Sequence, residues 1–262
     1  MAFKAIYQEH YRAILGTVSV LALIFLWELL LTFVIPLNPF FFTKPSLIAV
    51  AFQEQVIHGA LWNDLAVSSR AFIWGFGLAI LFGIPIGAVM GWRRRAEYTL
   101  DPFLTALYAS PLVALAPLII VVFGVGLFAK AMLVFLLSVF PFIFNTFAGV
   151  RSTDRLLINV VRSFGGHEKD LYLKVIFPSS LPYIVAGARI ALGRGLVGII
   201  VGEFYAASEG IGFAISRFGD TYKLPEMFAG ILVLMIAAVA LTEGMRKLED
   251  ILAPWRASQE SR

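Results

Sequence analysis

Long apolar runs limit what this chain can fold into more than any other feature of its sequence. A helix needs roughly 20 mainly apolar residues to cross the hydrocarbon core of a bilayer, and several stretches of the chain reach that length. Hydrophobic residues make up 60% of the chain and charged residues 15%, whereas soluble domains are typically about 45–50% apolar and about 25% charged. The surplus apolar surface must face lipid, so we predict an all-α polytopic membrane protein.

Six membrane-spanning helices are predicted from these runs. The first run is too long for the core of a signal peptide, and we interpret it as a retained helix. Helix breakers at 38–45 follow it, and then a short, mildly amphipathic helix at 46–58. The third run is interrupted by Pro111 and Pro117 and is closed by a glycine turn at 123–126. The predicted spans are 14–36, 71–92, 101–123, 128–148, 183–205 and 227–243.

Basic residues predict the orientation of these spans, because cytoplasmic loops carry an excess of Lys and Arg. One side of the predicted topology holds only Lys44, Arg70, Lys130, Arg217 and Lys223, whereas the other side holds the remaining basic residues apart from Arg189 and Arg194, which lie within the fifth span. Both termini are therefore expected in the cytoplasm, which requires an even number of spans. We expect a single transmembrane domain over 1–262, with cytoplasmic tails at 1–13 and 245–262, the first span and an external loop at 14–70, and a five-span core at 71–244 that includes a cytoplasmic loop at 150–182.

Small residues recur at helical spacing in the second and fifth predicted spans. Such stripes let two helix backbones approach closely, which is how helices associate in lipid. Packing within the chain fits this pattern, and so does packing at a subunit interface or along a moving seam. The residues are Gly75, Ala79, Gly83, Gly87 and Gly91 in the second span, and Gly187, Ala191, Gly195, Gly198 and Gly202 in the fifth.

The polar stretch after the fourth span is typical of two short amphipathic helices joined by a glycine elbow. Thr153 is expected to cap the first helix, and Gly165-Gly166 to end it through a left-handed turn. The second helix, at 167–177, is expected to stop at Pro178. Such a unit suits docking into a groove of another protein. The apolar face of its first helix comprises Leu156, Leu157, Val160, Val161 and Phe164.

This loop resembles the one in the integral membrane subunits of ABC importers. The motif of those subunits is a Glu-Ala-Ala triplet followed by Gly three residues on, then an aliphatic residue, a leucine-like residue and Pro. Gly165, Val175, Phe177 and Pro178 stand at those spacings. Asn159-Val160-Val161 replaces the triplet, so the motif glutamate is missing, and the resemblance implies the helix–elbow–helix shape without that residue's ion pair.

The resemblance extends from 45 to 255 and looks closest to the permeases of nitrate, sulfonate, taurine and bicarbonate importers. It is carried by short fragments whose order and spacing match. These are Pro117-Leu118, the turn at 123–126, Phe140-Pro141, Asn145-Thr146, Gly149-Val150-Arg151, 187–192, Glu203, 209–212 and Pro254-Trp255.

The resemblance implies a type I ABC importer fold that forms the translocation pathway for a small, anionic solute in the bacterial inner membrane. It also implies a second permease copy, giving a homodimer, two cytoplasmic ATPase subunits that bind ATP and Mg²⁺, and a periplasmic or lipid-anchored solute-binding protein. This chain itself is expected to bind no cofactor and no nucleic acid. The resemblance places the contact with the ATPase at Asn159, Arg162, Ser163, Phe164, Gly165, Gly166 and Pro178.

Polar groups inside the predicted spans are candidates for lining the pathway, because such groups are costly in lipid. Ser138 and Asn145 are expected either to line it or to bond a neighbouring helix. Arg194 is the deepest cation and suits an anionic solute, and an ion pair with Glu203 of a second subunit is the alternative. Glu28 either pairs with a neighbouring helix or lies nearer the interface.

Catalytic chemistry finds no support in the sequence. The chain has no cysteine and no Gly-x4-Gly-Lys phosphate loop, and His10, His58 and His167 lie far apart, so no metal or catalytic site is predicted. A self-sufficient secondary transporter or channel is the main alternative function, but the two halves show no matching interrupted helices of the kind expected for inverted repeats. A membrane-embedded enzyme is the third alternative.

Overall fold

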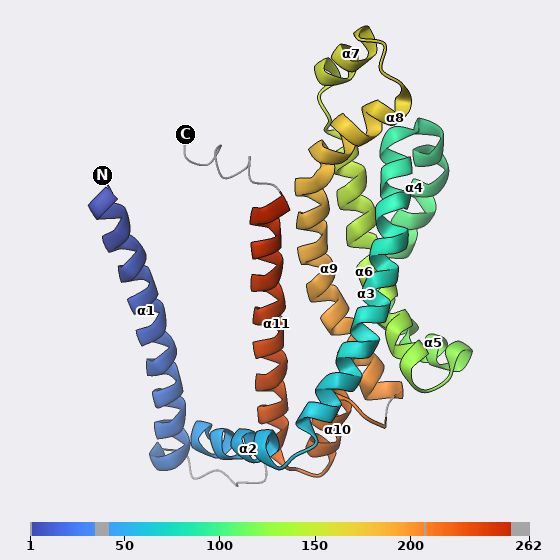
Figure 1. Ribbon diagram of the computed structural model, residues 1–262. Helices are drawn as coiled ribbons and strands as arrows, with labels where there is room; N and C mark the ends of the chain where they lie inside the picture. Colours follow the sequence, from blue (N-terminus) through green and yellow to red (C-terminus); the bar gives the residue numbers. More distant parts are fainter. Residues whose placement is uncertain (1, 35–41, 207, 253–262) are drawn as a thin grey trace. The chain divides into compact units, whose positions relative to one another are not determined.

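The computed structural model describes residues 2–34, 42–206 and 208–252, and every element in these ranges is a helix (Figure 1). The breakers predicted at 38–41 and the Pro254-Trp255 fragment lie outside the described residues. Within these ranges, five helices are long and apolar enough to cross a membrane, and a bent pair makes a sixth span if it is counted as one. Contacts divide the chain into two compact units, 1–62 with 214–233 and 63–213 with 234–262.

In the first unit, α1 (Ala2–Leu29) and its π-helical end η1 (Leu30–Val34) are followed by α2 (Pro45–Ile57). Glu28 joins them, because its carboxylate accepts hydrogen bonds from the Ser46 backbone N–H at 3.0 Å and the Ser46 hydroxyl at 2.9 Å. Lys44 lies 3.7 Å from the same carboxylate. Glu28 therefore caps the first turn of α2, where an acidic group also favours the helix dipole.

The same unit contains most of α10 (Ile211–Asp220) and the beginning of α11 (Leu224–Leu252). The Gln55 side chain donates a hydrogen bond to the Glu226 carbonyl at 3.0 Å, and the Trp27 and Phe228 rings meet edge to face at 6.0 Å. These contacts connect α1, α2 and the start of α11. Helix α10 was not predicted, since 209–212 was singled out only as a fragment of the family resemblance.

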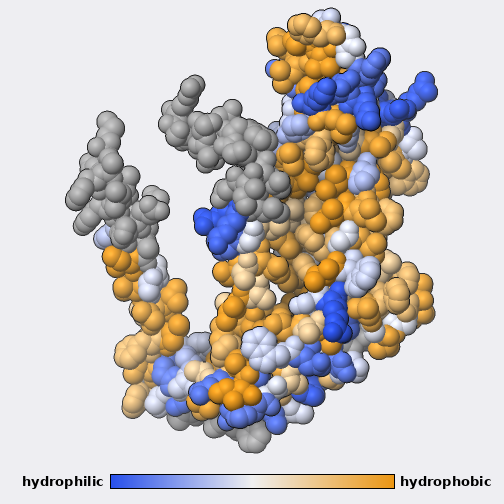
Figure 2. All heavy atoms as spheres, in the orientation of Figure 1, coloured by the Kyte–Doolittle hydropathy of each residue, from blue (hydrophilic) through white to orange (hydrophobic). Residues whose placement is uncertain are grey.

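The second unit is built around α6 (Leu127–Arg151), most of whose apolar length is buried. Helices α3 (Leu61–Trp92) and α9 (Phe177–Ala206) lie along it, and Figure 1 shows α6 and α9 side by side. The visible flanks of these long helices are mostly hydrophobic (Figure 2). Helix α3 begins ten residues earlier than the span predicted at 71–92.

Glycine lets the three helix backbones touch. A Cβ atom added at Gly83 would lie 2.6 Å from the Phe142 Cβ, and one added at Gly187 would lie 2.7 Å from the Asn145 Cβ. Both contacts are closer than real side chains allow, so only glycine fits. All eight glycines of the two predicted stripes lie against α6 of the same chain: Gly75, Gly83, Gly87, Gly91, Gly187, Gly195, Gly198 and Gly202.

The span predicted at 101–123 is a broken helix. Helix α4 (Arg94–Ala109) is bent by 86° relative to the segment formed by η2 (Leu112–Leu115) and α5 (Ala116–Phe123). Pro111 causes the break, because its ring forces the preceding residue out of the helical conformation and Ser110 is extended. Pro102 lies within α4 instead of opening a span, so the helix starts earlier than predicted. The glycine turn at 123–126 is present, with positive φ at Gly124 and Gly126.

Candidate functional site

The loop after α6 forms the predicted helix–elbow–helix at one end of the second unit (Figure 1). Its first helix, α7 (Arg155–Ser163), is capped by Asp154, whose carboxylate accepts a hydrogen bond from the Leu156 N–H at 2.8 Å. The prediction that Thr153 is the cap was therefore wrong. Asp154 has the extended backbone that a capping residue needs, whereas the Thr153 hydroxyl is buried without a hydrogen bond.

The elbow itself is made by two glycines with different roles. Gly165 adopts a φ of +74°, a conformation that costs other L-residues strain, and its N–H bonds the Arg162 carbonyl at 3.0 Å. Gly166 leaves no room for a side chain, because a Cβ there would lie 2.5 Å from the Val161 Cγ1. The turn therefore requires glycine at 165 for its backbone conformation and at 166 because a side chain would not fit.

The second helix of the elbow does not end at Pro178, as predicted, but continues beyond it. Helix α8 (Glu168–Leu171) passes through the π-helical turn η3 (Tyr172–Ile176) directly into α9. Pro178 was expected to stop the helix, but it lies in the first turn of α9, immediately after the π-helical turn. Because α8 and η3 lead into α9 without a gap, Pro178 is an interior position, and the adjacent π-helical turn is the kind of local adjustment that accommodates a missing N–H. The elbow is thus continuous with a long helix of the second unit.

An exposed apolar surface covers the outer side of α7. We call it the elbow face and define it as Leu156, Leu157, Val160 and Phe164, all of which are exposed. Phe164 is 88% exposed, and the tip of the second unit at α7 appears strongly hydrophobic above hydrophilic residues (Figure 2). Val161 was predicted on this face but turns inward. Asn159, Arg162 and Ser163 are exposed beside it.

The inner side of α7 anchors the elbow to the long helices. Ile158 and Val161 pack against a buried cluster that includes Val150 of α6 and Leu171 of α8. An ion pair between Arg151 and Glu97 joins the end of α6 to the start of α4. The elbow is therefore packed against α6 and continuous with α9.

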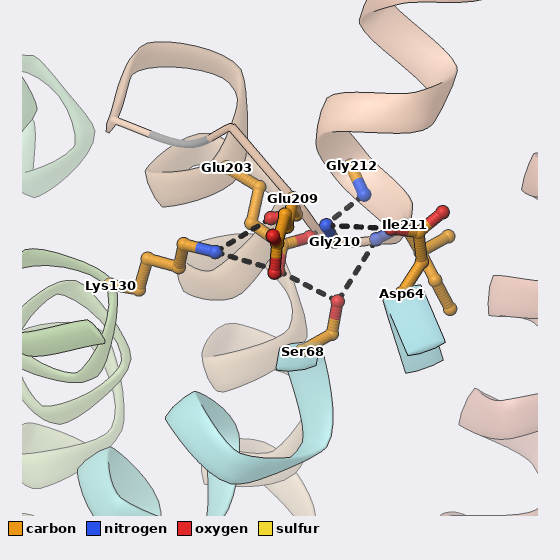
Figure 3. A network of polar contacts seen from close by, with 8 residues as sticks. All are labelled: Asp64, Ser68, Lys130, Glu203, Glu209, Gly210, Ile211 and Gly212. Carbon is orange, nitrogen blue, oxygen red and sulfur yellow. Dashed lines mark hydrogen bonds and ion pairs between the residues drawn. The ribbon is translucent and has the colours of Figure 1, made fainter. Parts of the chain in front are cut away.

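A buried polar network occupies the opposite end of the second unit (Figure 3). Glu203 of α9 is 1% exposed and Lys130 of α6 is 3% exposed. Their charged groups lie 3.6 Å apart, and the Glu203 carboxylate also accepts hydrogen bonds from the Ser68 hydroxyl at 2.7 Å and the Gly212 N–H at 2.8 Å. The ion pair and these hydrogen bonds offset the cost of removing the two charged groups from water.

The same network fixes the turn before α10. The Gly210 N–H donates to the Asp64 carboxylate at 3.0 Å, the Ile211 N–H donates to the Ser68 hydroxyl at 3.0 Å, and the Lys130 ammonium donates to the Glu209 carbonyl at 2.7 Å. Gly210 has a φ of +120°, and a Cβ there would collide with the Glu203 carboxylate. The turn at 209–212 is therefore shaped by side chains of α3, α6 and α9.

The residues predicted to line the pathway are dispersed along α6 and α9. Ser138 is buried and its hydroxyl donates to the Ala191 carbonyl at 3.1 Å, while the Asn145 amide donates to the Pro141 carbonyl at 2.8 Å. Glu203 is engaged by Lys130 of the same chain. Arg194 is exposed on the surface of the chain, and its guanidinium lies 4.9 Å from the Tyr108 ring centroid.

Comparison with known proteins identifies the chain. The family model for inner membrane components of binding-protein-dependent transport systems matches residues 79–255, well over half of the chain. The chain belongs to this family. This permease is 31% identical, over 96% of its length and 100% of the relative's, to the formylaminopyrimidine transport permease protein ThiX of Halalkalibacterium halodurans. It is also 32% identical to the taurine transport system permease protein TauC of Escherichia coli, over 92% of this chain and 88% of that one.

A third relative is the putative aliphatic sulfonates transport permease protein SsuC of Bacillus subtilis, which is 34% identical over 82% of the permease and 78% of its own length. Among solved structures, an inward-facing MetNI methionine ABC transporter matches with a TM-score of 0.61 and 17% identity, over 80% of the permease and 99% of that chain. The permease therefore has the fold of a type I ABC importer subunit.

Sequence reasoning missed three members of the buried network: Asp64, Ser68 and Lys130. Lys130 was assigned to the external side at the start of the fourth span, and it lies in the first turn of α6. One signal in the sequence could have indicated this pair. A lysine stands at the start of one predicted span and a glutamate at the end of another, and both lie near the same predicted membrane face. Nothing in the sequence of the permease specified that the two side chains meet.

Proposed function

We propose that this permease forms the translocation pathway of an ABC importer and is driven by a separate ATPase docked on the elbow face. In this proposal two permease copies assemble with two ATPase subunits, which bind ATP and Mg²⁺, and with an external solute-binding protein. The chain lies in the bacterial inner membrane with both termini in the cytoplasm. Membership of the family and its fold support this arrangement.

The observation that carries the proposal is the elbow face. Four large apolar side chains are exposed on a helix that belongs to an extramembrane loop, where exposure to water is unfavourable. Their inner neighbours are packed against α6 and α8, so the exposed face remains available for a partner. An amphipathic helix inserted into a groove of another protein is a common recognition mode.

The solute is proposed to be a small organic molecule. The relatives carry names that refer to formylaminopyrimidine, taurine and aliphatic sulfonates, and another refers to riboflavin. These names share small size but not charge, so they do not establish the anionic solute expected from the sequence. Because a separate binding protein delivers the solute, similarity between permeases carries little information on its identity.

Co-purification tests the docking. The permease is expressed with the ABC ATPase encoded beside it, and Phe164→Ser is expected to abolish co-purification while the permease elutes from size exclusion as the wild type does. Tyr98→Ser is the matched control, because Tyr98 is an exposed aromatic residue at the start of α4, outside the elbow face. Replacing Gly165 with Trp is expected to act like Phe164→Ser.

A self-sufficient transporter is the competing function. If no ATPase associates with the wild-type chain, and liposomes that contain the chain alone accumulate solute in response to an ion gradient, the importer proposal fails. Stimulation of ATP hydrolysis in the assembled complex by a loaded binding protein supports the proposal.

A further inference from the structure

Arg194 lies near the middle of the membrane span predicted at 183–205. It stands about 16 Å along α9 from position 183, where the predicted span begins, and a hydrocarbon core is about 30 Å thick. Helix α6 gives the same depth independently, because Ser138 is at the centre of the span predicted at 128–148 and bonds Ala191, one turn before Arg194. A charge at this depth is costly and marks a functional site by default.

The Arg194 guanidinium is held in place but not neutralised. It stacks on the Tyr108 ring, whose own position is fixed by the rings of Phe140 at 5.5 Å and Phe144 at 5.3 Å. Among the residues that the structure describes, no carboxylate pairs with Arg194. The contrast with Lys130 is informative, because that cation is buried and paired with Glu203. Arg194 is the deep cation whose hydrogen-bond donors remain available.

The break between α4 and α5 lies at the same level. Tyr108 is followed by the non-helical Ser110 and Pro111, where the chain bends by 86°. Non-helical backbone at membrane depth is tolerated where it is buried in protein or lines a water-filled cavity. Secondary transporters build their solute sites near the midplane from such discontinuous helices, although this permease belongs to a different class. Two independent features, an unneutralised guanidinium and a helix break, thus coincide.

We propose that Arg194, supported by Tyr108, is a binding site for the oxyanion group of the solute in transit, so that the permease itself selects for negative charge. This proposal rests on the proposed transport function and adds the class of ligand. The planar guanidinium presents paired donors that match a carboxylate or sulfonate, and an aromatic face beneath it leaves those donors pointing outward. The solute-binding protein is then not the sole selective component.

Direct binding to the purified chain in lipid nanodiscs tests the site without the binding protein or the ATPase. The probes are ethanesulfonate and propionate, compared with ethyl methyl sulfone, which is similar in shape and uncharged. Saturation-transfer NMR titrations are expected to show saturable binding of the two anions only. Arg194→Gln should weaken binding at least about tenfold, and Tyr108→Leu by about threefold to tenfold, the range expected for loss of a cation–π contact. Arg189→Gln, an exposed arginine on the same helix, is the matched control.

Several results overturn the proposal. These are equal binding of the sulfone, absence of saturable anion binding to the wild-type chain, and unchanged binding in Arg194→Gln. A further contradicting result would come from native mass spectrometry. If Arg194→Gln abolished the dimer, the guanidinium would be a contact between subunits and not a solute site. Failure of the ATPase to co-purify with the wild type would instead refute the proposed function, and the nanodisc titration would still be interpretable.

Discussion

Lys130 and Glu203 are two opposite charges removed almost completely from solvent. Taking each ion out of water costs several kcal/mol, and the Ser68 hydroxyl, the Gly212 N–H and the Glu209 carbonyl supply the interactions that offset this cost. Removing one partner leaves the other buried and uncompensated, which is much worse than removing both. The pair therefore makes the turn before α10 dependent on residues of three other helices.

Lys130→Met is expected to lower the free energy of unfolding by about 3–5 kcal/mol, since Glu203 then remains buried without its cation. The double variant Lys130→Met/Glu203→Leu should recover much of that loss. Unfolding by SDS in mixed micelles, followed by circular dichroism, provides the measurement.

Lys174→Met serves as the control for this comparison. Lys174 pairs with Asp170 at 2.8 Å, but both side chains are solvent-accessible, so no measurable change is expected. Equal stability of Lys130→Met and the wild type would contradict the role assigned to the buried pair.

Single residues were predictable from the sequence where their role is local. The role of Gly165 could be predicted because it ends a helix within its own loop. For Glu28 the sequence left two alternatives, and the structure shows that its carboxylate caps α2. An ion pair between Glu203 and Arg194 of a second subunit was one of two alternatives, but a lysine 73 positions away in the same chain occupies Glu203 (203 − 130 = 73). Pairings across that distance depend on tertiary packing, which local patterns do not encode.

At the scale of elements, spans were predicted well where hydropathy alone decides. The spans predicted at 128–148 and 183–205 lie inside α6 and α9. The broken third span could not be located from composition, because proline is compatible with a straight span, a kink or a break. Pro141 lies inside an intact α6, whereas Pro111 ends a helix. Neighbouring packing decides between these outcomes.

The glycine contacts give a prediction for α3. Gly87→Val is expected to prevent correct folding, since a Cβ there would lie 2.9 Å from the Thr146 Cβ and would also collide with the Ile143 carbonyl. Gly77→Val is the matched control on the same helix, because nothing lies within 4 Å of a Cβ at that position. Fluorescence-detected size exclusion should show aggregation of Gly87→Val alone. A monodisperse Gly87→Val protein would refute the close approach of α3 and α6.

The elbow gives a second prediction at this scale. Gly165→Val should destabilise the turn by about 1–2 kcal/mol, the cost of a left-handed conformation for a residue with a side chain. Gly165→Asn should cost less, because asparagine tolerates this conformation. Hydrogen exchange of the amides at 164–166, whose hydrogen bonds close the turn, reports the difference. Equal exchange in the two variants would contradict the dependence on φ.

At the scale of the whole molecule, the proposed orientation can be tested directly because the chain has no cysteine. Thr99 and Ser208 are exposed positions near opposite ends of the second unit. The test uses cells whose outer membrane is permeable and whose inner membrane is intact. A maleimide that cannot cross the inner membrane is expected to label Ser208→Cys and not Thr99→Cys. Thr99→Cys should become reactive only after the membrane is opened. The reverse pattern would place the elbow outside and exclude contact with a cytoplasmic ATPase.

The continuity of α8, η3 and α9 has a mechanical consequence. Helical structure continues without a gap from Glu168 to Tyr205, 38 residues, through the π-helical turn η3. Its long part, α9, has 30 residues and forms a rod of about 45 Å at 1.5 Å per residue. One end of this rod carries the elbow, and Glu203 lies near the other. Since the backbones of α6 and α9 touch at several points between those ends, the pair resists bending. A displacement of α8 is therefore expected to reach the far end of the pair, whereas the helical structure of the second unit is broken at the Gly165 elbow and at Ser110–Pro111.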